Sequence, residues 1–139
     1  MTMSRAKAVA FAMLLAASAV QVAHAATDCA NPQDQRAMNE CASRAYTRAD
    51  TELNRRYRAL QGRLKDDRDG ARKLTEAQRA WIAFRDAECA FQTSGTAGGS
   101  IEPLARAVCL EAVTKSRTTA LQRYLECREG DSNCPVATP

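Results

Sequence analysis

The sequence predicts an all-α fold, namely an antiparallel three-helix bundle stapled by disulfides. Apolar residues recur at spacings of three and four in three long segments, which is the period of an amphipathic helix. Glycine, proline and serine gather in the short stretches between these segments, and no β-type alternation is visible. The chain of 139 residues also carries six cysteines. An even number of cysteines in a small exported chain is typical of a disulfide framework.

The beginning of the chain has the organisation of a cleaved secretory signal peptide. Arg5 and Lys7 give a positive start, an apolar stretch follows over 8–20, and a small-x-small pattern ends at Ala25. The apolar stretch is shorter than the ~20 residues that cross a membrane. We therefore expect cleavage after Ala25, a periplasmic or secreted product, and no membrane insertion of the mature chain. The expected division is a signal peptide over 1–25, a helical domain over 26–130 and a tail over 131–139.

The first helix is expected to begin at Asn31-Pro32, with the asparagine as N-cap and the proline at the first helical position. It should end near Lys65, where a charged connection leads to Gly70. Its apolar stripe follows the helical period over about eight turns. The stripe consists of Met38, Cys41, Ala45, Ala49, Leu53, Tyr57, Leu60 and Leu64.

A second helix is expected to follow, beginning either at Thr75 or a turn earlier near Asp69. Thr75 and Gln78 fit a capping box, which favours the later start without excluding the earlier one. Trp81 and Phe84 are expected in the core, because they are the largest fillers on this stripe. The stripe consists of Leu74, Ala77, Trp81, Phe84, Glu88 and Phe91.

The third helix follows a small-residue stretch over 93–100 that interrupts the helical period. Ser100 is expected to cap this helix, with Pro103 in its first turn and Gly130 as the residue that ends it. The tail beyond Cys134 is polar and is expected to be loose. The expected stripe is Ile101, Leu104, Val108, Ala112, Ser116, Ala120 and Tyr124, widened by Cys109, Val113, Leu121 and Leu125.

The antiparallel arrangement also suggests how the cysteines pair. It brings the start of the first helix, the end of the second and the start of the third to one end of the bundle. Four cysteines belong to this end, and the remaining two lie close together at the other end of the third helix. A disulfide contributes about 2–4 kcal/mol, so we expect these bonds to hold the fold. We expect Cys127 to pair with Cys134, and among the other four we favour Cys29–Cys41 with Cys89–Cys109, although the alternative pairings stay open.

Composition argues against several classes of function. Removing Arg5 and Lys7 lowers the 20 basic residues to 18 against 16 acidic ones, a net charge of +2, which is too small to indicate nucleic-acid binding. The one histidine, His24, leaves with the signal peptide, and with it the commonest general base and metal ligand. No Gly-x-Ser-x-Gly or phosphate-loop motif is present. We therefore expect a protein that is not an enzyme and that uses no metal and no cofactor.

The segment from Leu74 to Cys89, LTEAQRAWIAFRDAEC, carries a specific pattern. Together with the Cys29 and Cys41 opening and the Gly99-Ser100 loop, it resembles the LprI-type domain, a group of small exported bacterial proteins named for lysozyme inhibition. The match extends over 29–125. The resemblance implies a helical fold and a protein partner, namely a lysozyme. The motif residues, which we expect to be structural, are Leu74, Gln78, Trp81, Phe84, Arg85 and Asp86.

Within this motif, Arg85 lies on the flank of the second helix beside Cys89. We expect it to reach a carboxylate or a helix C-terminus on a neighbouring helix, with Glu52 and Asn54 as candidate partners. Asp86 is expected to point elsewhere, because adjacent residues on a helix face different directions.

The loop between the second and third helices is the best candidate for a binding surface. It is small and flexible in composition, and Cys89 and Cys109 hold it at both ends, which lowers the entropy cost of docking it into a groove. The cleft of a lysozyme carries two carboxylates, so an inhibitor should present hydrogen-bond donors or a positive group. The candidate residues, which could act with the backbone N–H groups of the loop, are Ser94, Thr96, Gly98, Gly99, Ser100 and Arg106.

Two functions are compatible with these features. The first is an inhibitor that plugs the substrate cleft of lysozyme-like glycosidases. The second is an envelope binding module or chaperone-like helical module with no glycosidase target, in which the loop is a plain connector. A net charge of +2 offers no long-range attraction to a cationic lysozyme, which counts mildly against the first.

Overall fold

The computed structural model describes residues 28–128 and 130–136, so the expected signal peptide over 1–25 and its cleavage site lie outside the described residues. Within the described part, the chain forms three α-helices and one short 3₁₀-helix, with no strand. This confirms the predicted three-helix class. None of these helices is both long and apolar enough to cross a membrane. The elements are α1 (Gln35–Arg63), α2 (Arg68–Gln92), η1 (Ser94–Thr96) and α3 (Glu102–Leu125).

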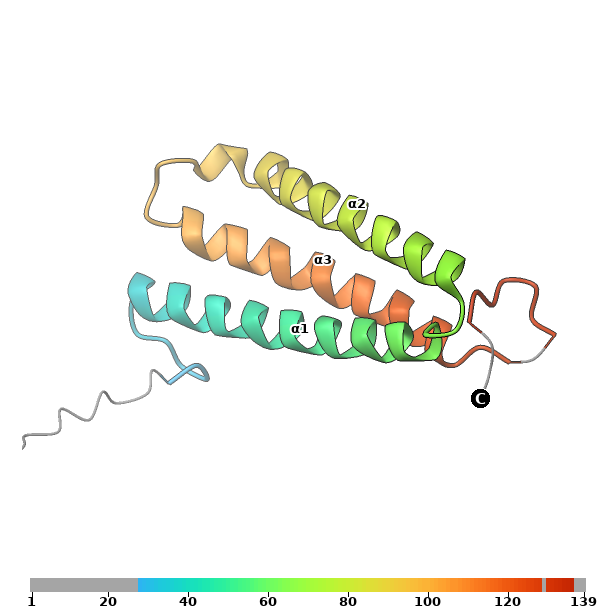
Figure 1. The fold of residues 1–139 in the computed structure, drawn as a ribbon. Coiled ribbons are helices and arrows are strands. Elements are labelled where there is room, and N and C mark those ends of the chain that lie inside the picture. Colours follow the sequence, from blue (N-terminus) through green and yellow to red (C-terminus); the bar gives the residue numbers. More distant parts are fainter. Residues whose placement is uncertain (1–27, 129, 137–139) are drawn as a thin grey trace, which may run out of the picture.

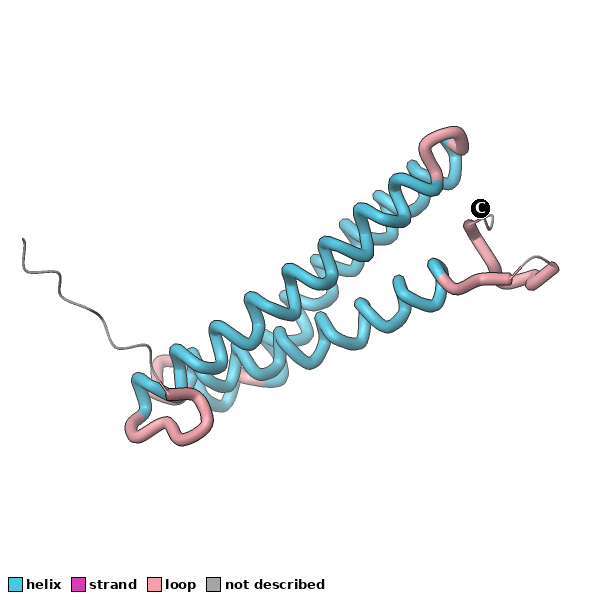
Figure 2. The backbone as a smooth tube through the Cα atoms, turned by 90° about the horizontal axis from the view of Figure 1, so that it is seen from below, coloured by secondary structure: helices cyan, strands magenta, loops and turns pink. Residues whose placement is uncertain are grey.

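The helices run up, down and up along a common direction, so that α1 and α3 are parallel and α2 is antiparallel to both (Figure 1). The loop between α2 and α3 lies at the same end as the start of α1. The turn from α1 to α2 and the tail after α3 lie together at the other end, as Figure 2 also shows. Two hydrogen bonds tie α1 to α3 near the two ends: Asn39 Nδ2 donates to the carbonyl of Ser100 at 3.5 Å, and Arg63 Nη1 donates to that of Leu125 at 2.7 Å.

The helices do not share their contacts evenly. α1 packs closely against α3, whereas α2 approaches α3 at fewer places and lies further from α1. Before Leu53 of α1 and Leu121 of α3, the buried residues of this pair are small, with Ala42 and Ala49 on α1 and Ala107 and Thr114 on α3. Small side chains let two backbones come close together. The apolar stripe of α2 is therefore only partly covered, with Phe84 and Phe91 exposed.

The first two helices begin at aspartates. Asp34 caps α1, with its carboxylate accepting from the amide of Ala37 at 2.7 Å, so the expected start at Asn31 is wrong. Asp67 caps α2 in the same way, accepting from Gly70 at 2.9 Å, which selects the earlier of the two expected starts. Thr75 is not a cap, because its hydroxyl donates to the carbonyl of Ala71 inside the helix. The carboxylate of an aspartate accepts hydrogen bonds from the free amides of a first turn at least as well as the side chains of asparagine and threonine do.

The limits of α3 also differ from those expected. Ile101 takes the N-cap position without a side-chain bond, so Ser100 is not the cap, although Pro103 does lie in the first turn. The helix ends at Leu125, well before Gly130, which instead has φ +87° in a turn of the tail. The buried line of α3 runs through Ala107, Thr114 and Leu121, whereas Val108, Ala112 and Ser116 of the expected stripe are exposed. Close contact with α1 requires small side chains, so the face of α3 that carries the smaller residues is the one that is buried.

The main core lies toward the end where α1 turns into α2. It consists of buried leucines from α1 and α3 together with Val136 of the tail, which is only 2% exposed. The expectation of a loose tail beyond Cys134 is therefore wrong as far as Val136. Half-buried Tyr57, Leu74, Trp81 and Tyr124 pack around this cluster. The buried cluster is Leu53, Leu60, Leu64, Leu121 and Val136.

Three disulfides join the six cysteines, with the favoured pairing in each case. Their Cα–Cα distances of 5.5, 5.6 and 5.4 Å lie within the usual range for a disulfide. The first fastens the segment before α1 to its second turn, the second joins the end of α2 to the start of α3, and the third closes the tail. The pairs are Cys29–Cys41, Cys89–Cys109 and Cys127–Cys134.

The buried hydroxyl of Thr114 yields a stability prediction. It has no hydrogen-bond partner among the described residues, and a buried unsatisfied hydroxyl costs about 1–3 kcal/mol. Thr114→Val keeps the shape of the side chain and removes the hydroxyl, so the free energy of unfolding in a urea titration should rise by about 1 kcal/mol. Thr118→Val is the matched control, because it removes a hydroxyl that already has a hydrogen-bond partner. The Thr118 hydroxyl donates to the Thr114 carbonyl at 2.9 Å. A lower urea midpoint for Thr114→Val than for the unaltered protein would contradict the prediction.

Candidate protein-binding site

The loop between α2 and α3 is folded into consecutive turns. The amide of Thr96 donates to the carbonyl of Thr93 at 2.9 Å, and the amide of Gly99 donates to that of Thr96 at 3.0 Å. Gly98 has φ +75°, a left-handed conformation that favours glycine. Its amide donates to the carboxylate of Glu102 at 2.7 Å. The loop is therefore a defined set of turns, where the composition suggested a flexible connector.

These turns use the backbone donors that the sequence suggested for a partner. The amides of Thr96, Ala97, Gly98 and Gly99 all donate within the loop or to Glu102, so the proposed role for the backbone N–H groups is not supported at these positions. The hydroxyl of Thr96 is also engaged, because it donates to Thr93. The hydroxyls of Ser94 and Ser100 form no hydrogen bond with any other described residue, and both residues are exposed. The two serines are therefore the free donors of this loop.

Arg106 lies one turn into α3 and is half-buried. Its positive charge acts on Tyr46 of α1: burial raises the pKa of Tyr46, and the charges of Arg85 and Arg106 partly oppose that rise. Ser94 and Ser100 lie in the segment between α2 and α3, whereas Arg106 lies on α3 itself.

Exposed apolar side chains flank the loop on both sides. Phe91, in the last turn of α2, is 77% exposed, and Ile101 and Val108 at the start of α3 are also exposed. The helical period had assigned all three to core-facing stripes. At this end of the bundle the close pair is built from small residues, so there is no core deep enough to bury Phe91. Exposed aromatic and aliphatic side chains beside a rigid loop are typical of a protein contact surface.

Arg85 forms the centre of a polar cluster that joins α2 to α1. Its side chain is only 11% exposed, and its guanidinium lies 3.7 Å from a carboxylate oxygen of Asp50 and 2.8 Å from one of Asp86. The same group stacks over the rings of Trp81 and Tyr46, at 5.2 and 5.8 Å from their centroids. Cation–π contacts and carboxylates on both sides compensate a nearly buried charge. These contacts lie within the fold and join α2 to α1, and the structural role of Arg85 and Asp86 stays a prediction.

The partners of Arg85 differ from the candidates. Glu52 binds Arg55 and Arg56 on its own helix. Asn54 takes part indirectly, because its amide donates to the Asp50 carboxylate at 2.9 Å. Asp86 does not point away from Arg85, because the long arginine side chain bends back and Nε donates to it at 2.9 Å. The arginine side chain is long enough to reach Asp86, even though adjacent residues on a helix point in different directions.

The remaining motif residues have mixed outcomes. Gln78 is buried and accepts from Nε of Arg117 at 3.2 Å, while Leu74 and Trp81 pack against the core. Phe84 is 55% exposed, so its expected place in the core is wrong. It lines a shallow groove between α2 and α3, because α2 stands too far from the close pair to bury its whole stripe. Trp81, Val113 and Ala120 form the rest of the apolar wall of this groove.

Comparison with known proteins gives one family and one relative. The family model described as "Lysozyme inhibitor LprI" matches residues 26–121. A protein of Rhizobium meliloti (strain 1021), named as uncharacterised, is 36% identical over 137 residues, which cover 90% of this chain and 99% of the relative. No solved structure matches this chain.

The Arg85 cluster predicts a specific stability effect. Arg85→Met keeps much of the side-chain volume but leaves Asp50 and Asp86 without their shared cation, so the free energy of unfolding should fall by about 2 kcal/mol. The measurement is the urea midpoint of the purified protein. Arg55→Met is the matched control, since it removes an exposed ion pair of the same chemistry and should leave the midpoint unchanged. Equal midpoints for the two variants would show that the cluster does not stabilise the fold.

Proposed function

Since this chain belongs to the LprI lysozyme inhibitor family, we propose that it is an exported protein that binds and inhibits lysozyme-like glycosidases. The observation that carries the proposal is the family match over 26–121, which includes α1, α2 and nearly all of α3. Inhibition requires no chemistry from the inhibitor, only occupation of the substrate cleft. Cleavage after Ala25 and export to the periplasm or beyond are part of the proposal, because lysozymes attack the cell wall outside the cytoplasmic membrane.

The loop between α2 and α3 is the proposed contact surface. Its turns and the Cys89–Cys109 disulfide fix its shape in advance, which reduces the entropy lost on binding. Ser94 and Ser100 offer hydroxyl donors, and a hydrogen bond to a charged carboxylate is about twice as strong as a neutral one. A glycosidase cleft presents two such carboxylates. The loop therefore combines a preformed shape with donors of the right chemistry.

Phe91 and Ile101 supply the apolar part of this contact. Both are exposed on the helix ends that support the loop, so docking of the loop into a cleft would bring them against its rim. Large aromatic side chains contribute most to protein interfaces when a partner covers them. In this proposal the polar tip provides specificity and the phenylalanine provides much of the affinity.

The alternative, an envelope binding module without a glycosidase target, rests on a different surface. The groove between α2 and α3, with Phe84 and Trp81 on its wall, has the apolar character that accepts an amphipathic helix or an extended segment. Neither Ser94 nor Ser100 lines this groove, and Phe91 and Ile101 do not line it either. The two functions therefore predict sensitivity to substitutions at different residues.

Titration of the mature protein into a lysozyme tests the proposal, with lysis of bacterial cell walls as the readout. Activity should fall to a low plateau as the inhibitor reaches a molar excess, and the midpoint should depend little on salt because a net charge of +2 gives weak steering. Lysozymes of different classes are tested in parallel. Full activity of every class at high micromolar inhibitor would reject the proposal.

Replacing the segment Ser94–Gly99 with a short glycine linker should abolish inhibition while leaving the helical circular dichroism intact. The linker removes the turns and the Ser94 hydroxyl but leaves the Cys89–Cys109 disulfide in place. Unchanged inhibition by this variant would remove the loop from the contact surface.

A pair of phenylalanine variants distinguishes the two surfaces. Phe91→Ala should weaken inhibition by at least about tenfold, as expected for a central aromatic contact. Phe84→Ala removes an equally large exposed ring from the groove and should leave inhibition unchanged. The opposite result would move the inhibitory contact from the loop to the groove between α2 and α3.

A further inference from the structure

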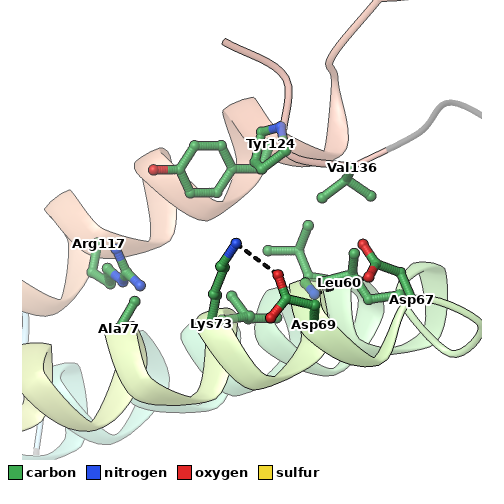
Figure 3. A pocket seen from close by; sticks show the side chains of 12 residues that line it. Leu60, Asp67, Asp69, Lys73, Ala77, Arg117, Tyr124 and Val136 are labelled. Carbon is green, nitrogen blue, oxygen red and sulfur yellow. Dashed lines mark hydrogen bonds and ion pairs between the residues drawn. The ribbon is translucent and has the colours of Figure 1, made fainter.

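A cavity of about 400 Å³ lies at the end of the bundle opposite the loop. Its walls come from the end of α1, the start of α2, the last turns of α3 and the tail, at the place where α3 diverges from the turn between α1 and α2 (Figures 2 and 3). This volume falls within the range of about 300–1,000 Å³ that is usual for small-molecule sites. The lining is mainly apolar, although Asp67, Asp69, Lys73 and Arg117 also belong to it. Its apolar part consists of Leu60, Leu64, Leu74, Ala77, Tyr124, Pro135 and Val136.

The tail gives the cavity one of its walls. The Cys127–Cys134 disulfide closes the chain into a short loop after α3, and Val136 then packs against Leu60 and Leu64 with only 2% of its surface exposed. Without this return of the chain, the leucines at the end of α1 would face solvent. The cavity is therefore a built feature of the fold, between three helices and a cross-linked segment.

Most charged groups around the cavity already have partners. Asp67 accepts from the amide of Gly70 as the cap of α2. Asp69 binds both Arg72 and Lys73, with Nζ of Lys73 at 2.7 Å. The hydrogen bond from Lys73, and after it the one from Arg72, lowers the pKa of Asp69. The carboxylates and Lys73 thus satisfy one another or the backbone within this structure.

Arg117 is the exception. Its Nε donates to the neutral amide of Gln78 at 3.2 Å, and no carboxylate of the described residues lies within ion-pair distance of it. Burial lowers its pKa, which shows that its environment disfavours the positive charge. Figure 3 shows Arg117 beside Ala77 at one end of the cavity, with Asp67 and Val136 at the other. One end of an apolar cavity therefore carries a cation without a counter-ion.

We propose that this cavity binds an amphipathic monoanion of the medium-chain fatty acid class, with the carboxylate on Arg117 and the alkyl chain along Leu60, Leu74 and Tyr124. Guanidinium groups bind carboxylates through two parallel hydrogen bonds, and a partly buried guanidinium group thereby gains a counter-ion. An alkyl chain matches the apolar walls. The site is independent of lysozyme binding, because it lies at the end of the bundle away from the loop.

Calorimetric titration of the mature protein with octanoate, decanoate and decanol tests this proposal. Each methylene buried in an apolar site raises affinity roughly fourfold, so decanoate, with two more methylenes, should bind about fifteenfold more tightly than octanoate. Decanol lacks the charge and should bind at least about tenfold more weakly than decanoate. Absence of heat with decanoate, or equal affinities for decanoate and decanol, would overturn the proposal.

Two variants and one control locate the site. Arg117→Gln should lower the affinity for decanoate to that for decanol, whereas Arg123→Gln changes an exposed cation of the same helix outside the cavity and should have no effect. Ala77→Trp fills the cavity from an exposed position and should abolish binding of both ligands without loss of helicity. Equal losses in Arg117→Gln and Arg123→Gln, or unchanged binding in Ala77→Trp, would place the ligand elsewhere and reject this site.

Discussion

The close approach of α1 to α3 is the constraint on which the rest of the structure depends. Ala42 and Ala49 face α3, and Ala107 and Thr114 are small enough to receive them, so the two parallel helices pack backbone to backbone. A third helix cannot lie equally close to both. α2 is consequently held by specific tethers, namely the Arg85 cluster, the Gln78–Arg117 bond and the Cys89–Cys109 disulfide. Its apolar stripe is covered where these tethers and the leucine cluster lie and uncovered elsewhere.

This division explains why the two ends of the bundle differ. At the end where α1 turns into α2, large leucines and the returning tail form a core, and α3 diverges enough to leave a lined cavity. At the other end the close pair contains only small residues, and the end of α2 projects Phe91 and the loop beyond it. A disulfide replaces the missing apolar contacts there. A rigid projecting loop and a partly open, mainly apolar cavity are thus consequences of one uneven packing arrangement.

The sequence was sufficient to predict the helices and the stripe of α1, because the helical period determines these features locally. It favoured the observed pairing of the cysteines but left alternatives open, because four of the six cysteines belong to the same end of the bundle. It was insufficient for the exposure of Phe84 and Phe91, since their burial depends on how closely α2 approaches the other two helices. The same holds for α3, where the buried line passes through Thr114 rather than Val108. The cap at Asp34 and the bonding of the loop amides depend on competition between nearby polar groups, which a one-dimensional pattern does not resolve. Ser94 and Ser100 were predicted as candidates, whereas the apolar flank of the loop was assigned to the core.

The conflict between sequence pattern and structure is itself informative about the binding surface. A sequence that places Phe91 and Ile101 on apolar stripes, in a fold that cannot bury them, carries a cost in exposed apolar area. The core needs neither residue, because the disulfide already joins α2 to α3 at this end. A partner that covers the two side chains removes that cost, and the preformed turns let it do so without ordering the loop. We therefore propose that the uncovered stripe and the preformed loop are parts of one contact surface.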